Sequence, residues 1–138
     1  MPARDLYHNT VVNALVKDGW KIADDPLHLT YGQRELYVDL GAEHPLAAEK
    51  AGRKIAVEIK SFIGPSNLRE LEVAIGQYVL YREILAQQQP ERQMYLAVSL
   101  GAYEDVFTDP LGQLAVESQE LRLIVFDEQL ERIAQWIP

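Results

Sequence analysis

The chain has 138 residues, 48% of them hydrophobic and 25% charged, which predicts a single globular domain over residues 1–138. Because it contains no cysteine, disulfides and thiolate metal sites are excluded, and no apolar run approaches the roughly 18 residues that a membrane-spanning helix needs. The 21 acidic against 13 basic side chains give a formal charge of −8, which disfavours unaided binding to nucleic acid, since DNA-binding surfaces are typically basic.

The first part of the chain predicts a helix followed by a short strand. Residues 1–5 lack the apolar core of a secretory signal, and together with the absence of cysteine this leads us to expect a cytoplasmic protein with no membrane segment. Apolar residues at helical spacing predict a helix over Leu6–Lys17 that Gly19 ends. Trp20–Ile22 then predicts a short strand before a polar turn.

Two strands are predicted next. Glu35–Leu40 alternates between two faces, one of which carries Leu36, Val38 and Leu40. This strand can continue through Leu46–Ala48 before a turn around Lys50–Gly52 reverses the chain. Arg53–Lys60 is the clearest strand. One of its faces is apolar and the other is mostly polar, with Ile55, Val57 and Ile59 on the first and Lys54, Ala56, Glu58 and Lys60 on the second.

A long helix follows the second strand. Ser66 or Asn67 can cap it, with Glu70 completing a capping box, and the helix runs to about Gln88. Its predicted core stripe includes Leu68, Leu71, Ile75 and Tyr78.

The rest of the chain predicts three more elements. Met94–Val98 and Leu121–Phe126 predict buried strands, and Glu128–Trp136 predicts a closing amphipathic helix. Helices and strands in this order predict an α/β fold around a mixed sheet.

Three polar side chains of the predicted sheet can meet. Glu58 and Lys60 are two residues apart on one strand, so both stand on the same face. An antiparallel hairpin turning near Ala51-Gly52 carries them back toward Asp39. A turn with an even number of residues puts Asp39 on that face too, whereas an odd number requires a bulge. The sequence leaves this register open.

Two carboxylates and one ammonium in a cluster suit metal-assisted hydrolysis of a phosphodiester. Asp39 and Glu58 would supply hard oxygen ligands for Mg²⁺ or Mn²⁺, and such an ion polarises the scissile phosphate and lowers the pKa of a bound water. Lys60 would orient that water and offset the developing negative charge. The alternative is an ordinary solvated face of an antiparallel sheet, where such residues are common.

His8 is a further candidate. It shares a helix face with Val11, Val12 and Leu15, which is more typical of a semi-buried histidine with a hydrogen-bond partner than of a metal ligand.

Short phrases along essentially the whole chain carry a family resemblance: Asp5-Leu6-Tyr7-His8, Leu15-Val16-Lys17-Asp18-Gly19-Trp20, Leu36-Tyr37-Val38-Asp39-Leu40-Gly41-Ala42-Glu43, Ala56-Val57-Glu58-Ile59-Lys60-Ser61-Phe62, Gly76-Gln77-Tyr78-Val79-Leu80-Tyr81-Arg82, Tyr95-Leu96-Ala97-Val98 and Gln135-Trp136-Ile137. They resemble the XisH-like proteins, bacterial DNA-element excision factors within the PD-(D/E)XK nuclease superfamily. This match is more specific than the spacing of the three polar residues alone.

The resemblance implies a restriction-endonuclease-like three-layer sandwich with an α-β-β-β-α-β core and a mixed sheet. Asp39 would take the superfamily's aspartate position, and Glu58-Ile59-Lys60 would be its E-x-K element. Val38 stands where the superfamily's motif has a proline, a position that varies widely among its members.

Gln77 and Tyr81, one helical turn apart, are similar to the Q-x-x-x-Y element of the RecB-like nucleases. That element usually faces the metal site or the DNA backbone, so the resemblance implies that Gln77 steadies Lys60 or a phosphate. The alternative is a packed tyrosine with a hydrogen-bonded glutamine beside the helix's apolar stripe.

XisH-like proteins are associated with the site-specific excision of a DNA element by a recombinase, and with a companion called XisI. Two hypotheses follow. In the first, the chain is an Mg²⁺- or Mn²⁺-dependent endonuclease that acts on DNA during excision. The set of Asp39, Glu58 and Lys60 favours this hypothesis. In the second, it is a catalytically silent nuclease-fold subunit that binds a XisI-like partner or the recombinase, which the acidic charge favours. The sequence does not determine the oligomeric state, and a homo-oligomer stays open.

Overall fold

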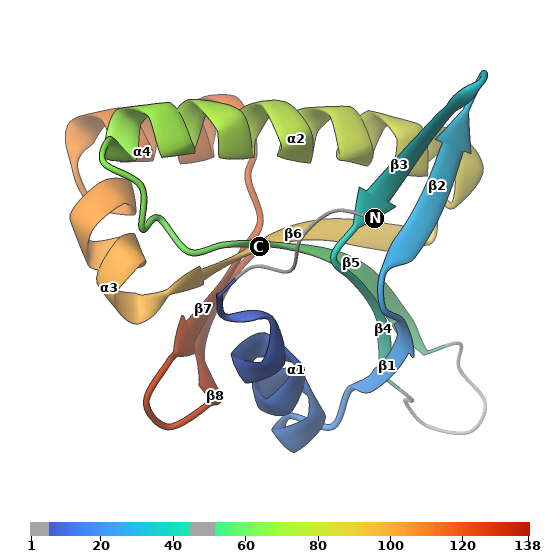
Figure 1. Cartoon of the computed structure of the whole chain (residues 1–138), viewed down its shortest axis with the longest axis horizontal. Helices are drawn as coiled ribbons and strands as arrows, with labels where there is room; N and C mark the ends of the chain where they lie inside the picture. Colours follow the sequence, from blue (N-terminus) through green and yellow to red (C-terminus); the bar gives the residue numbers. More distant parts are fainter. Residues whose placement is uncertain (1–5, 45–51) are drawn as a thin grey trace.

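The computed structural model describes residues 6–44 and 52–138. They form a mixed α/β fold in which a six-stranded mixed sheet lies between helices on its two faces (Figure 1). β5, β6 and β7 are parallel neighbours, and the other neighbouring pairs are antiparallel. In sheet order the strands are β1 (Lys21–Asp24), β4 (Leu40–His44), β5 (Arg53–Lys60), β6 (Arg92–Ser99), β7 (Leu123–Asp127) and β8 (Arg132–Ile137).

The helices form a layer on each face of this sheet. One face is covered by α1 (His8–Lys17), drawn in dark blue in Figure 1. The other face is covered by α2 (Asn67–Gln88), α3 (Leu100–Ala102), the π-helical segment η1 (Tyr103–Phe107) and α4 (Pro110–Ser118). Within the described residues, no helix is both long and apolar enough to cross a membrane.

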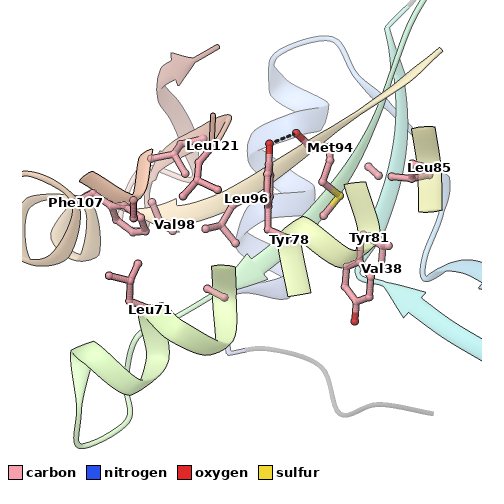
Figure 2. Close-up of a cluster of buried hydrophobic side chains, with 14 of the residues drawn as sticks. Val38, Leu71, Tyr78, Tyr81, Leu85, Met94, Leu96, Val98, Phe107 and Leu121 are labelled. Atoms are coloured by element: carbon pink, nitrogen blue, oxygen red, sulfur yellow. Dashed lines mark hydrogen bonds between the residues drawn. The ribbon is translucent and has the colours of Figure 1, made fainter. Parts of the chain in front are cut away.

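Alternation along β5 divides the interior into two cores. Ile55, Val57 and Ile59 lie in the core that faces α1, and Ala56 lies in the core under α2. The predicted alternation of these residues between two faces is therefore confirmed. Figure 2 shows the α2 core, in which Tyr78 is fully buried. The Tyr78 hydroxyl donates to the carbonyl of Met94 at 3.1 Å and accepts from the backbone N–H of Arg122 at 3.0 Å, which ties α2 to β6 and to the approach of β7.

The predicted helix over 67–88 is confirmed, and of its two predicted caps Ser66 is the one used, since its hydroxyl accepts from the backbone N–H of Arg69 at 3.2 Å. Two other predicted details, the capping box and the burial of Leu68, are wrong. Glu70 instead accepts from the backbone N–H of Gly64 at 3.0 Å, so no capping box forms. Leu68 is 54% exposed and lies outside the core stripe, because it falls on the solvent side of the first turn.

The prediction of one strand over Glu35–Leu40 is wrong, because the chain bends at Asp39. Before the bend, β3 (Arg34–Val38) pairs with β2 (Leu27–Tyr31) in a separate two-stranded sheet; after it, β4 enters the main sheet. Leu36 and Val38 therefore pack in the α2 core while Leu40 lies in the α1 core. The expected continuation through Leu46–Ala48 and the turn at 50–51 lie outside the described residues.

The predicted closing helix over Glu128–Trp136 is also wrong. The segment contains β8, which pairs antiparallel with β7 across a bulge at Val125/Phe126. Trp136 packs against Trp20 and Tyr95, with ring centroids 5.6 and 5.2 Å away. This cross-sheet packing of a large aromatic residue overrides the helical spacing of the segment. The helical segments between 100 and 118 were not predicted at all.

Candidate functional site

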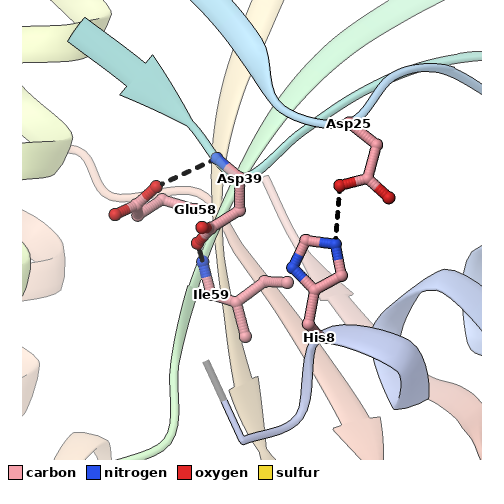
Figure 3. A network of polar contacts seen from close by, with 5 residues as sticks. All are labelled: His8, Asp25, Asp39, Glu58 and Ile59. Carbon is pink, nitrogen blue, oxygen red and sulfur yellow. Dashed lines mark hydrogen bonds and ion pairs between the residues drawn. The ribbon is translucent and has the colours of Figure 1, made fainter. Parts of the chain in front are cut away.

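Asp39 lies at the bend between β3 and β4, directly opposite Glu58 on β5. The register pairs Leu40 with Val57, so the preceding residue reaches Glu58. The backbone N–H of Asp39 donates to Glu58 Oε1 at 3.2 Å, and the backbone N–H of Ile59 donates to Asp39 Oδ2 at 2.7 Å (Figure 3). These two hydrogen bonds hold together two carboxylates that lie 19 residues apart in the sequence.

Glu58 is the buried member of this pair, with only 6% of its surface exposed. Burial, followed by the nearby charge of Asp39, raises the pKa of Glu58 from 4.5 to about 8, although the Asp39 N–H and the charge of Lys60 oppose the shift. At neutral pH most Glu58 side chains therefore carry a proton. A cation placed between the two carboxylates would favour the ionised form of Glu58 and so oppose both causes of the raised pKa.

Lys60 contributes the positive charge of the site. It is two residues beyond Glu58 on β5, so the two side chains stand on the same face of the sheet. Its ammonium is close enough to lower the pKa of Glu58. Lys60 is partly exposed at the end of the strand.

α2 carries the two remaining residues of the predicted site, Tyr81 and Gln77. Burial, followed by the nearby charges of Glu58 and Asp39, raises the pKa of Tyr81 to about 12. Its hydroxyl therefore keeps its proton and can donate a hydrogen bond. Gln77, one turn earlier on α2, has a buried Oε1 with no hydrogen-bond partner among the described residues. That oxygen can accept a hydrogen bond from a ligand or from a side chain that moves.

His8 is held by a single carboxylate. It is 4% exposed, and its Nε2 lies 2.8 Å from Asp25 Oδ1. In Figure 3, Asp39 is drawn between this pair and Glu58, whose side chain points away from His8. The prediction of a histidine with a hydrogen-bond partner is confirmed. The partner itself, Asp25, was not predicted, because no local spacing in the sequence signals a contact between residues 17 positions apart.

The donor set fits a hard divalent ion that keeps several waters. Among residues 6–44 and 52–138, no three His, Cys, Asp or Glu side chains lie close enough together to hold a metal ion. The protein ligands at this site would therefore be the two carboxylates of Asp39 and Glu58. Mg²⁺ is commonly held by one or two carboxylates plus water and substrate phosphate oxygens.

The hairpin that leads into this site was not predicted, although its sequence carries a signal for it. Leu27, Leu29, Leu36 and Val38 alternate on either side of Gly32, whose φ of 62° suits the turn. This pattern is a recognisable hairpin signal. Two aromatic residues on the other face of the hairpin, His28 and Tyr37, were missed with it.

Comparison with known proteins gives a consistent result. The family model described as "XisH protein" matches residues 1–134. An XisH family protein from Nostoc punctiforme PCC 73102 is 38% identical, with a TM-score of 0.89 over 97% of this chain and 100% of that one. An fdxN element excision controlling factor protein from Anabaena variabilis is also 38% identical, with a TM-score of 0.87 over 98% of this chain and 100% of that one. No curated protein gives a significant match.

Proposed function

This chain belongs to the XisH family, and from that premise we propose that it is a metal-dependent, endonuclease-like factor that acts on DNA during the excision of a DNA element. One solved relative is named an excision controlling factor. The observation that carries the proposal is the direct contact between Asp39 and Glu58, with Lys60 on the same face. An ordinary solvated sheet face does not bury a carboxyl such as Glu58 against a second carboxylate.

The order of elements around the site supports a nuclease fold. Along the chain, the main sheet is built as α1, β1, β4, β5, α2 and β6, with the β2–β3 hairpin inserted after β1. This order is similar to the α-β-β-β-α-β core of the PD-(D/E)XK nucleases. In this arrangement, Asp39 takes the place of the superfamily's aspartate and Glu58-Ile59-Lys60 that of its E-x-K element.

Each residue of the site then has a distinct role. Asp39 and Glu58 would hold Mg²⁺ or Mn²⁺, which when bound polarises the scissile phosphate and lowers the pKa of a bound water. Lys60 orients the attacking water and offsets the charge that develops on the phosphate. Gln77 steadies the Lys60 ammonium through its free Oε1, and the neutral Tyr81 hydroxyl donates a hydrogen bond to the DNA backbone.

Replacing Lys60 with alanine tests this proposal. We expect the wild type to nick supercoiled plasmid or branched DNA with Mn²⁺, and K60A to lower the rate by roughly 100-fold or more, because one preorganised charge at the reacting group is lost. Lys54→Ala is the matched control, since Lys54 stands on the same face of β5 at its far end, 4.0 Å from Glu43. A wild type as inert as K60A, with melting curves showing both folded, would contradict the proposal.

A second function is favoured by the charge of the chain. With a net charge of −8, it is repelled by DNA at long range. We therefore also propose, as the alternative, a regulatory subunit that binds a XisI-like companion or the recombinase. If K60A supports excision in a reconstituted reaction as well as the wild type does, the regulatory function is favoured over the enzymatic one.

A further inference from the structure

The hairpin β2–β3 has a core face and an outer face. The two strands pair in unbroken register, so their side chains alternate between the faces. Leu29 and Val38 lie on the core face, in the core under α2. His28 and Tyr37 lie opposite each other on the outer face. The tip of the hairpin, at Tyr31, is hydrogen-bonded to Gln87 near the end of α2 (Figure 1).

The rings of His28 and Tyr37 form a flat stack. Their centroids are 4.9 Å apart and their planes 17° from parallel. The His28 side chain is 47% exposed, and its Nε2 lies 3.6 Å from Glu35 Oε1. Neither ring belongs to either hydrophobic core, so interior packing does not account for the pair. A half-exposed stack of this kind offers the surface on which nucleobases stack in proteins that bind unpaired strands.

This stack lies close to the candidate metal site. Tyr37 precedes Asp39 by two residues, which corresponds to roughly 7 Å of extended chain. That distance is about two nucleotide steps at the rise of roughly 3.4 Å per nucleotide. A strand whose phosphate lies at Asp39, Glu58 and Lys60 can therefore place on the stack a base that is one or two nucleotides away.

The net charge of the chain bears on which form of nucleic acid can bind. At a net charge of −8, attraction to phosphates contributes little to binding, so affinity has to come from contacts with the bases. Stacking on an aromatic ring does not depend on net charge. Paired bases in a duplex cover one another's faces, whereas an unpaired base can be splayed out onto a protein ring.

We infer that His28 and Tyr37 form a stacking platform for an unpaired base, and that the strand acted on at Asp39, Glu58 and Lys60 carries an unpaired nucleotide near the scissile phosphate, as in a flap, a bubble or a single strand. The location of the phosphate rests on the proposed function. The platform itself rests on the outer face of the hairpin.

Binding measured without metal tests the platform independently of cleavage. Fluorescence anisotropy in EDTA would compare a labelled flap oligonucleotide with a fully paired duplex of the same length. Tyr37→Ala and His28→Ala should each weaken flap binding roughly tenfold, while Tyr37→Phe, which keeps the ring, should bind as the wild type does. Tyr31→Ala is the matched control, because Tyr31 is an exposed tyrosine on the opposite face of the same hairpin, hydrogen-bonded to Gln87.

Several outcomes would overturn the inference: no flap binding by the wild type, unchanged binding by Tyr37→Ala and His28→Ala, or an equal loss in Tyr31→Ala or on the duplex. Removing the unpaired base from the oligonucleotide should reproduce the loss with wild-type protein, which keeps the inference testable if a variant fails to fold. If the platform variants behave as expected but the wild type never cleaves with Mn²⁺, the nuclease proposal fails and the base-binding platform stands.

Discussion

Replacing Glu58 with glutamine should stabilise the metal-free protein at alkaline pH, by on the order of 2–4 kcal/mol at pH 9. The pKa of Glu58 is raised from 4.5 to about 8 in the folded state. Between these two values the folded protein keeps a proton that the unfolded chain has lost, so the free energy of unfolding falls as pH rises. Glutamine is neutral at every pH and keeps the oxygen that accepts from the Asp39 N–H, so the variant escapes this loss.

Urea unfolding in EDTA at pH 4.5, 7 and 9 measures the effect. The difference between E58Q and the wild type should be small at pH 4.5, grow through pH 7 and level off above pH 8. Glu72→Gln, a neutral replacement of an exposed carboxylate on α2, serves as the control and should show no such growth. A difference that does not change with pH would mean that Glu58 is not the titrating group.

The apparent affinity for Mn²⁺ should rise about 50-fold between pH 6 and pH 8. Mn²⁺ has to displace the proton from Glu58, whose pKa is about 8, and competition with one proton changes the apparent affinity about tenfold per pH unit. Above pH 8 the affinity should level off, because the carboxyl is already ionised.

Isothermal titration at pH 6.5 in two buffers of different ionisation enthalpy would count the protons released. We expect close to one per Mn²⁺ bound by the wild type. E58Q should bind more weakly and release fewer protons. Binding that is tight at pH 6 and independent of pH would place the ion at other ligands.

The elements predicted correctly are those whose sequence pattern has one interpretation. The alternation of Arg53–Lys60 admits only a strand, and β5 spans those residues. The long periodic segment after Ser66 is α2. In contrast, Ile133 and Trp136 are three residues apart, a spacing that suits a helix face. The long-range pairing with β7 and the packing of Trp136 on Trp20 and Tyr95 favour β8 instead.

The geometry of the site depends on long-range contacts that no local pattern encodes. The position of Asp39 follows from the pairing of β4 with β5 and from the bend that separates β3 from β4. The raised pKa of Glu58 follows from burial under α2 and from the approach of Asp39. The sequence pointed to these residue types, but neither the burial nor the register could be derived from it.

Thermal unfolding at pH 8 with and without Mn²⁺ examines the Asp39–Glu58 pair as a cation site. Asp39→Asn is the informative variant, because its amide oxygen can still accept from the Ile59 N–H while the ligand charge is lost. Wild-type protein should melt several degrees higher in Mn²⁺ than in EDTA, because an ion that binds only the folded state stabilises it, and D39N should lose this increase. An increase of the same size in D39N, or none in the wild type, would contradict a metal site at these two carboxylates.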